Sequence, residues 1–359
     1  MTSRQHGEMP KPWYNLLTID LLFRVLSTTF FHPFVAWMVP LCLRAQGTPY
    51  DHTSMRVTII YASSVSLFAL LSIVNQRVAF GKPREVDLTR EVIVITGGAS
   101  GLGLLVAEVY GMRGASVAVL DVQDMDTEGD VRGVDFYRCD VGDRAQVEKA
   151  ASEIEEDLGT PTILINNAGV VNGKPLLELS AEQIERNFRV NLLSHFHTLQ
   201  TFLPGMIRQN RGTIVTVSSV LGRLGCRNLS DYTAAKAGLI AMHTSLVAEL
   251  PPSSNIKTIL VTPGQLSTSL FAGVQTPSNF FGPVLEPVDV AKEIIRAVDD
   301  GRSALLAMPL YSRWVFLLGV LPVGVQRLIR KACGVDKAME GFVGNAHDFR
   351  EEPKAQLEI

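Results

Sequence analysis

The stretch Thr96-Gly97-Gly98-Ala99-Ser100-Gly101-Leu102-Gly103 decides how this chain of 359 residues folds. It follows a short β-branched run, Val92 to Thr96, and leads into a helical pattern. Glycines at such a strand-to-helix turn permit a tight bend and a close approach of the backbone to a ligand. The helix that begins here offers free N–H groups and the positive end of its dipole to an anion. A glycine cluster alone also suits an ordinary turn, so its surroundings decide between the two interpretations.

The chain after Glu91 alternates short β-branched runs with helical stretches, which is the pattern of a parallel sheet covered on both faces. Asp143 can cap one of the helices, and Ser180 with Gln183 forms a capping-box pattern for the next. We therefore predict one α/β domain, a Rossmann-type doubly wound parallel sheet, over residues 86–310. Its strands are expected at 92–96, 116–121, 134–139, 162–166, 213–217, 256–261 and 304–308.

An acidic residue ends the second expected strand. Asp121 lies 18 residues after Gly103, close to the roughly 20 at which a carboxylate meets the ribose hydroxyls of a dinucleotide. The same carboxylate repels the additional phosphate of NADP, and the glycine turn contains no arginine or lysine that would attract it. These residues predict a dinucleotide site that favours NAD, with NADP as the alternative. The other interpretation of Asp121 is a plain residue at a strand end.

Tyr232 and Lys236 lie four residues apart, so a helix would place them on one face. Oxidation of an alcohol needs a base for the hydroxyl proton, and a phenol normally titrates near pH 10. A fixed ammonium beside the phenol, together with a positive nicotinamide ring, would bring its pKa closer to neutral. We expect Tyr232 to be the general acid/base and Lys236 to supply this charge.

These motifs together resemble the short-chain dehydrogenase/reductase family over about residues 90–310. The resemblance implies a sheet of about seven strands in the order 3-2-1-4-5-6-7. It also implies two further catalytic residues. Ser219, 13 residues before Tyr232, would bind the substrate oxygen, and Asn191 would complete the proton relay to Lys236. Spacing favours Ser219 over its neighbour Ser218, and the family habit of pairing subunits implies a homodimer.

The resemblance also implies which residues contact the cofactor. Besides the glycine turn it covers the Asn166 to Gly169 signature, a pair near the adenine, and a loop that meets the nicotinamide carboxamide. The implied cofactor-binding residues are Thr96, Gly97, Ser100, Gly101, Leu102, Gly103, Asp121, Asp140, Val141, Asn167, Ala168, Gly169, Tyr232, Lys236, Pro263, Gly264 and Thr268.

Residues 1–85 form a separate, apolar N-terminal segment with two candidate membrane helices. Residues 57–74 carry no charge and are about long enough to cross a bilayer, whereas residues 21–43 are interrupted by a charge and two prolines. A cleaved signal peptide and buried core helices are the alternatives. The distribution of basic residues favours the N-terminus and the catalytic part on the cytosolic side.

Residues 311–359 form an apolar and basic extension that could lie in a lipid headgroup layer or pack as an ordinary helix. Its residues 334–344 resemble the tail of the membrane-bound retinol and 17β-hydroxysteroid dehydrogenase-like branch, whose members sit on the endoplasmic reticulum or lipid droplets. That resemblance implies retinoids, steroids or long-chain alcohols as substrates. The substrate lid is expected at residues 226–229 and 268–281, where Phe271, Phe280 and Phe281 are apolar.

The bulk composition excludes other classes of protein. A formal net charge of -3 gives no basic field for nucleic acid, and the four cysteines show neither a disulfide framework nor the spacing of a zinc site. No metal is therefore expected, and a reducing compartment is. Two rival functions stay open: an NADPH-dependent ketone reductase of lipid synthesis, against which Asp121 argues, and a catalytically idle lipid-surface protein of the same fold.

Overall fold

The computed structural model describes residues 17–125, 131–251, 254–274, 276 and 278–343. The predicted N-terminal and C-terminal segments therefore extend beyond the described residues, and positions 275 and 277 of the predicted lid also lie outside them. The chain forms two compact units. The first unit comprises residues 1–82 together with 279–281, and the second comprises 83–278 and 282–359. The described part of the C-terminal extension therefore belongs to the same unit as the sheet.

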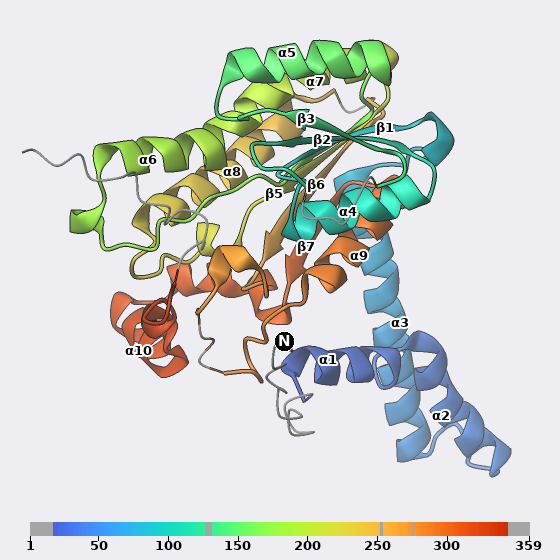
Figure 1. Cartoon of the computed structure of the whole chain (residues 1–359). Helices are drawn as coiled ribbons and strands as arrows, with labels where there is room; N and C mark the ends of the chain where they lie inside the picture. Colours follow the sequence, from blue (N-terminus) through green and yellow to red (C-terminus); the bar gives the residue numbers. More distant parts are fainter. Residues whose placement is uncertain (1–16, 126–130, 252–253, 275, 277, 344–359) are drawn as a thin grey trace, which may run out of the picture. The chain divides into compact units, whose positions relative to one another are not determined.

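The second unit is built on one parallel sheet of seven strands in the order β3-β2-β1-β4-β5-β6-β7 (Figure 1). This order, with the reversal between β1 and β4, confirms the predicted doubly wound fold. Alignment of Thr96 with Asn166 and of Asn166 with Thr216 brings the ends of β1, β4 and β5 to one edge. The strands are β1 (Val92–Thr96), β2 (Ser116–Asp121), β3 (Val134–Arg138), β4 (Ile163–Asn166), β5 (Gly212–Val217), β6 (Ile256–Pro263) and β7 (Ala304–Met308).

Helices cover both faces of this sheet, as its almost wholly apolar strands require (Figure 1). On one face α4 (Gly101–Met112) and α9 (Pro287–Asp299) pack in a core that includes Tyr110 and Ile294. On the other face α5 (Arg144–Asp157), α7 (Ser194–Gln209) and α8 (Ser230–Glu249) pack around Phe202 and Met206. The carboxyl ends of the strands stay uncovered by these helices, which is where doubly wound folds bind ligands.

The helix starts follow the local sequence signals. The Asp143 side chain accepts a hydrogen bond from the Ala145 N–H at the start of α5. Ser180 and Gln183 form the complete capping box of α6 (Ala181–Phe188), which confirms that prediction. These caps satisfy backbone donors that would otherwise lack partners, so they fix where α5 and α6 begin.

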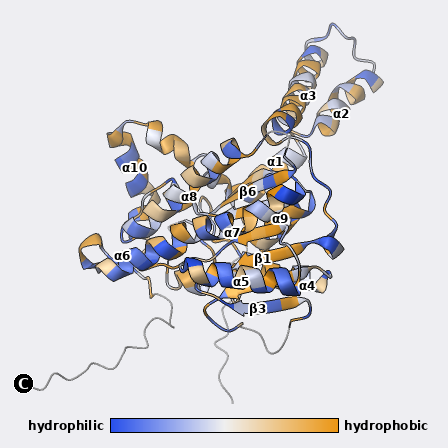
Figure 2. Ribbon diagram, turned by 90° about the horizontal axis from the view of Figure 1, so that it is seen from above, coloured by the Kyte–Doolittle hydropathy of each residue, from blue (hydrophilic) through white to orange (hydrophobic). Residues whose placement is uncertain are grey.

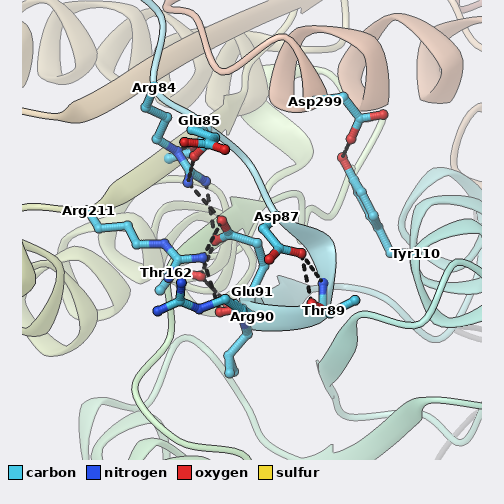
Figure 3. A network of polar contacts seen from close by, with 12 residues as sticks. Arg84, Glu85, Asp87, Thr89, Arg90, Glu91, Tyr110, Thr162, Arg211 and Asp299 are labelled. Carbon is cyan, nitrogen blue, oxygen red and sulfur yellow. Dashed lines mark hydrogen bonds and ion pairs between the residues drawn. The ribbon is translucent and has the colours of Figure 1, made fainter.

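A buried polar network closes the opposite, amino-terminal end of the sheet (Figure 3). The Arg84 guanidinium lies 2.8 Å from the Glu91 carboxylate, and both side chains are fully buried. Arg211 approaches the same carboxylate at 2.7 Å, and the Thr162 hydroxyl donates to it as well. Arg84 also donates to the Thr213 hydroxyl at 2.8 Å. Each buried charge thus has partners, and the network joins the chain entering the unit to β1, β4 and β5.

The first unit contains α1 (Ile19–Thr28), α2 (Pro33–Ala45) and α3 (Thr53–Phe80), and apolar residues dominate α2 and α3 (Figure 2). Among the described residues, α3 alone is long and apolar enough to cross a membrane as one helix. The predicted 21–43 span is two helices bent by 51°, because Pro33 starts a new helix after a break of four residues. Large apolar side chains of α3 are exposed, Phe68 by 76% and Val78 by 81%.

Candidate active site

The turn between β1 and α4 has room only for glycine. Gly97 and Gly101 have φ angles of +64° and +55°, in the left-handed region. A Cβ on Gly103 would lie 2.2 Å from the Gly97 carbonyl oxygen, and one on Gly98 would lie 2.9 Å from the Val119 side chain. Side chains at Gly97, Gly98 and Gly103 would clash, and without them the backbone turns tightly into α4, whose first N–H groups can face an anion.

The strand that follows in the sheet, β4, is joined to this turn by hydrogen bonds. The Asn167 side chain donates to the Gly97 carbonyl at 2.9 Å, and the Thr96 hydroxyl accepts from the Asn167 and Ala168 N–H groups. A Cβ on Gly169 would lie 3.0 Å from the Asn191 side-chain oxygen, and 3.8 Å from the Lys236 Nζ. Asn167 therefore holds the glycine turn in place, and the small Gly169 allows the backbone to lie close to Asn191 and Lys236 of the predicted proton relay.

Asp121 reaches the glycine turn from the end of β2. Its carboxylate accepts a hydrogen bond from the Ala99 N–H at 3.0 Å, and others from Val122 and Gln123. Each carboxylate oxygen has two lone pairs, so acceptor capacity remains for a ligand hydroxyl. At the other implied adenine contact, Asp140 accepts from the Gly142 N–H at 2.8 Å, and Val141 is buried.

The implied nicotinamide loop also lies at this edge. The Gly264 N–H donates to the Met308 carbonyl at 2.7 Å, which fixes the turn after Pro263 at the end of β7. The Thr268 methyl group faces Gly101, at 3.8 Å from where a glycine Cβ would stand. A nicotinamide dinucleotide fits this arrangement. It could be held across the carboxyl edge of the sheet by the glycine turn, the Asp121 carboxylate and these loops.

Tyr232 and Lys236 occupy one face of α8, buried to 4% and 3% exposure. Lys236 Nζ lies 5.6 Å from the centroid of the Tyr232 ring and donates to the Val217 carbonyl at 3.1 Å. Burial lowers the pKa of Lys236 from 10.5 to about 8. Burial also raises the pKa of Tyr232 above 10, and a hydrogen bond with Ser219 opposes this only in part.

The sequence expectation of a Tyr232 pKa closer to neutral concerned a site that holds both Lys236 and a positive nicotinamide ring, so it stays a prediction. In the cofactor-free protein the dominant effect is desolvation, because the whole phenol is removed from water. The phenol is protonated at neutral pH in this state, so it is prepared to donate a proton. A base form requires additional positive charge at the site.

The two neighbouring serines have different partners. The Ser218 hydroxyl donates to the backbone carbonyl of Lys236 at 2.8 Å, so it ties β5 to α8. The Ser219 hydroxyl accepts from the Leu221 N–H at 3.1 Å, lies 3.5 Å from the Pro263 carbonyl oxygen, and interacts with the Tyr232 phenol so as to lower its pKa. Ser219, not Ser218, is thus the serine beside the phenol.

Asn191 is fully buried in a five-residue π-helical turn, Arg189–Leu193, between α6 and α7. Its amide donates to the Val170 carbonyl at 2.8 Å, and its oxygen accepts from the Val170 N–H at 3.1 Å. Single π-helical turns inside helices often mark functional sites. This turn brings Asn191 close to Gly169 and hence to the neighbourhood of Lys236.

Apolar residues pack around Tyr232, and the sequence patterns did not predict this position for two of them, Met339 and Phe342. Phe271 of the predicted lid meets the Tyr232 ring edge-on, with centroids 5.8 Å apart. Phe280 and Phe281 instead belong to the first unit. Met339 and Phe342 come from the C-terminal extension, and a Met or Phe in a tail carries no pattern that would announce this position.

Comparisons with known proteins agree with this arrangement. The short chain dehydrogenase family model matches residues 91–278. Short-chain dehydrogenase/reductase family 16C member 6 of Bos taurus is 34% identical over 272 residues, which cover 72% of this chain and 85% of the relative. Epidermal retinol dehydrogenase 2 of Homo sapiens is 33% identical over 288 residues, covering 77% and 93%. Retinol dehydrogenase 10 of Homo sapiens is 32% identical over 298 residues, covering 73% and 87%.

A solved structure supports the fold. The ligand-free aldohexose dehydrogenase of Thermoplasma acidophilum superposes with a TM-score of 0.54 at 23% identity, covering 62% of this chain and 94% of that one. The chain belongs to the short chain dehydrogenase family. It is an oxidoreductase of the alcohol dehydrogenase type, and this family membership implies a nicotinamide cofactor, NAD or NADP.

Proposed function

We propose that this enzyme moves a hydride between NAD(H) and an alcohol or carbonyl group of a lipophilic substrate, with a retinoid, steroid or long-chain alcohol as the substrate class. The observation that carries the proposal is the meeting of Ser219, Tyr232 and Lys236 under an apolar cover at the carboxyl edge of the sheet. The relatives that bear the name retinol dehydrogenase favour a retinoid as the first compound to test.

In the proposed mechanism a substrate carbonyl oxygen accepts hydrogen bonds from the hydroxyl groups of Ser219 and Tyr232, whereas a substrate alcohol donates its hydroxyl proton toward the Tyr232 phenolate. When a carbonyl is reduced, Tyr232 donates its proton to that oxygen, and when an alcohol is oxidised the phenolate takes the proton back. The bound cofactor supplies or accepts the hydride and, when oxidised, adds a positive charge. Lys236 favours the phenolate by its charge. Asn191 would complete the proton relay, and its two hydrogen bonds with Val170 hold the chain next to Gly169, whose missing Cβ would lie 3.8 Å from the Lys236 Nζ.

NAD is the proposed cofactor because of Asp121. The Ala99 N–H holds its carboxylate at the glycine turn, where the extra phosphate of NADP would meet a negative charge. Titration of the purified protein should show clearly tighter binding of NADH than of NADPH. Asp121→Asn, which keeps the shape of the side chain and removes its charge, should reduce the difference in affinity between NADH and NADPH. Tighter binding of NADPH by the wild-type protein would contradict the assignment.

Membrane attachment is proposed from two exposed apolar regions, one in each unit. The first is α3 with its exposed apolar side chains. The second follows β7, where no acidic residue occurs from Gly301 to Val335 but Arg313, Arg327 and Lys331 are exposed. Cationic segments with exposed aromatic and aliphatic side chains suit a lipid headgroup layer. The exposed apolar side chains here are Trp314, Phe316, Leu317, Val320, Leu321, Val323, Val325 and Leu328.

The proposed location is the endoplasmic reticulum or lipid droplets, with the catalytic unit in the cytosol and the enzyme a homodimer. Protease treatment of sealed microsomes tests the topology, because a cytosolic catalytic unit should be digested without detergent. Full protection of that unit would contradict it. Cross-linking in detergent, followed by mass measurement, should give a dimer.

The direct test of the function is cofactor conversion by purified protein in detergent with retinol, steroids and fatty alcohols. We expect turnover with at least one of these classes. Tyr232→Phe should reduce it by at least about 100-fold, within the usual range for removal of a general acid/base. Tyr61→Phe is a matched control, since Tyr61 lies in α3 of the first unit. Wild-type rates in Tyr232→Phe would refute the mechanism.

A further inference from the structure

The C-terminal segment 335–343, which we call the cover, packs against the catalytic tyrosine through Met339 and Phe342. It begins with a single 3-10 turn, Val335–Lys337, and has no other helix or strand among its described residues. Met339 is only 4% exposed and forms one buried apolar cluster with Leu229 and Tyr232. Partly buried residues around this cluster are Val171, Leu221, Cys226, Phe271, Val274 and Phe342.

Two loops of the active site are shaped to receive the cover. Gly173, in the loop after β4, has a φ of +66°, and its missing Cβ would lie 2.1 Å from the Phe342 ring. Gly273, in the loop after β6, has a φ of +80°, and its missing Cβ would lie 2.1 Å from the Gly341 carbonyl oxygen. Both positions thus combine a left-handed backbone with a space that the cover already fills.

Weak ties hold the rest of the cover. The Val343 N–H donates to the Ala272 carbonyl at 3.1 Å. The Cys226 thiol donates to the Val335 carbonyl at 3.2 Å, and burial, the larger influence, raises the pKa of this thiol. Arg330 pairs with Asp336 at the start of the cover. Most backbone hydrogen bonds of the cover lie within its own turns, and among the described residues only those at Val335 and Val343 join its backbone to the active-site loops. Such a segment opens at lower free energy than the strands of the sheet.

We propose that Met339 and Phe342 contact the substrate and determine specificity, on a cover that shifts to admit it. The inference rests on the proposed function of the same site. Ser219 and Tyr232 are 5% and 4% exposed, so a bulky alcohol that reaches them must displace what lies above. The cover is part of that surface, and after Lys337 it has no helix or strand among its described residues.

The side chains of the cover suit an uncharged, lipophilic substrate. The residues that pack with Tyr232 in this cluster include Leu229, Met339 and Phe342, all of which are apolar. Methionine is unbranched and flexible, so Met339 can adapt its shape to different apolar ligands. Phe342 adds a flat aromatic wall above Gly173. These contacts exclude strongly polar alcohols because burial of their hydroxyl groups without partners is unfavourable.

The first experiment compares substrates of different width in the full-length enzyme. The readout is the ratio of kcat/KM for a polycyclic secondary alcohol to that for an unbranched primary alcohol. Met339→Ala widens the space beside Tyr232, so this ratio should rise at least tenfold, mainly through KM, with the Kd of NADH unchanged. Met112→Ala is the matched control, because Met112 is 70% exposed at the far end of α4. A ratio within twofold of wild type would overturn the proposal.

The second experiment needs no turnover. In a Cys42→Ser, Cys333→Ser protein, Cys226 lies under the cover and Cys139 is buried in the core. Phe342→Ala should raise the rate of maleimide labelling at Cys226 at least tenfold, measured by mass spectrometry. Cys139 should stay unlabelled, since it reacts only if the protein unfolds. If Phe342→Ala leaves the rate of Cys226 labelling unchanged while Cys139 stays unlabelled, the proposal that the cover shields this site is wrong.

The two experiments separate failure of this inference from failure of the proposed function. If no lipophilic alcohol is turned over by the wild-type enzyme, the proposed substrate class is wrong, yet Cys226 labelling still decides whether the cover exists. If turnover occurs and Cys226 responds while the substrate ratio stays unchanged, the cover exists but Met339 does not select the substrate, which refutes its proposed role.

Discussion

Replacement of Lys236 by methionine should stabilise the cofactor-free protein while it abolishes turnover. Methionine has a similar length and no charge, so it can occupy the same buried space on α8. The lysine ammonium is 3% exposed, and among the described residues its one hydrogen bond is to the Val217 carbonyl. A buried cation with so little compensation is unfavourable to the folded state.

The magnitude follows from the pKa of Lys236. A drop from 10.5 to about 8 on folding, at about 1.4 kcal/mol for each pKa unit, corresponds to about 3 kcal/mol of lost stability below pH 8. Removal of the ammonium also leaves the Val217 carbonyl without its donor, at a cost of about 1 kcal/mol. The net gain for Lys236→Met is therefore about 2 kcal/mol. That gain corresponds to a rise in Tm of about 4–8 °C for a domain of this size.

The stability difference between wild type and Lys236→Met should depend on pH. The folded pKa of Lys236 lies below its unfolded value, so the folded state binds its proton less well. The cost is complete below pH 8 and disappears as the pH rises from 8 to 10.5. Thermal unfolding of wild type and Lys236→Met in the same detergent, without cofactor, should thus show a difference at pH 7 that shrinks by pH 10. A variant less stable than wild type at pH 7, or a difference independent of pH, would refute the reasoning.

Three further changes test the site and the fold. Ser219→Ala should lower kcat/KM by about 100- to 1000-fold, whereas Ser218→Ala, which loses only a bond to a backbone carbonyl, should stay within about tenfold of wild type; equal losses would contradict the choice. Gly103→Ala should weaken NADH binding at least about tenfold in calorimetry, because its Cβ would meet a backbone oxygen at 2.2 Å, while Gly324→Ala, with open space around it, should bind normally. Glu91→Gln should lower the free energy of unfolding in urea by about 3–5 kcal/mol. Partner hydrogen bonds outweigh burial and hold the Glu91 pKa below 4.5, so that difference should shrink as the pH falls through the folded pKa.

Local patterns predicted the strands of the sheet, and the family resemblance implied their order. Strands 92–96, 116–121 and 304–308 have the bounds expected from their β-branched runs. The sixth strand runs two residues further, to Pro263, because its last residues pair with Ala307 and Met308. Such pairing depends on a distant strand, which the local sequence does not reveal.

Some features of the candidate site were also predictable from the sequence, whereas others depend on the tertiary structure. Spacing alone singled out Ser219, and the structure supplies the physical reason, since Ser218 is engaged by the Lys236 carbonyl. The position of Met339 over Tyr232 depends on chain segments more than 100 residues apart, so no periodicity or motif predicts it. The raised pKa of Tyr232 likewise follows from burial, a property of the assembled fold, and not from the spacing to Lys236.

The two ends of the same strands have opposite physical characters. At the amino end of β1, Arg84 and Glu91 are buried with their charges paired and their hydrogen bonds made. At the carboxyl end, Lys236 is buried as a cation beside a neutral phenol, which destabilises the folded state. A site that must change its protonation state cannot have every charge neutralised in advance, because its pKa values would then move away from the working range. The stability that the active site gives up must come from elsewhere in the fold, and the closed network at the opposite edge stabilises the strands that position it.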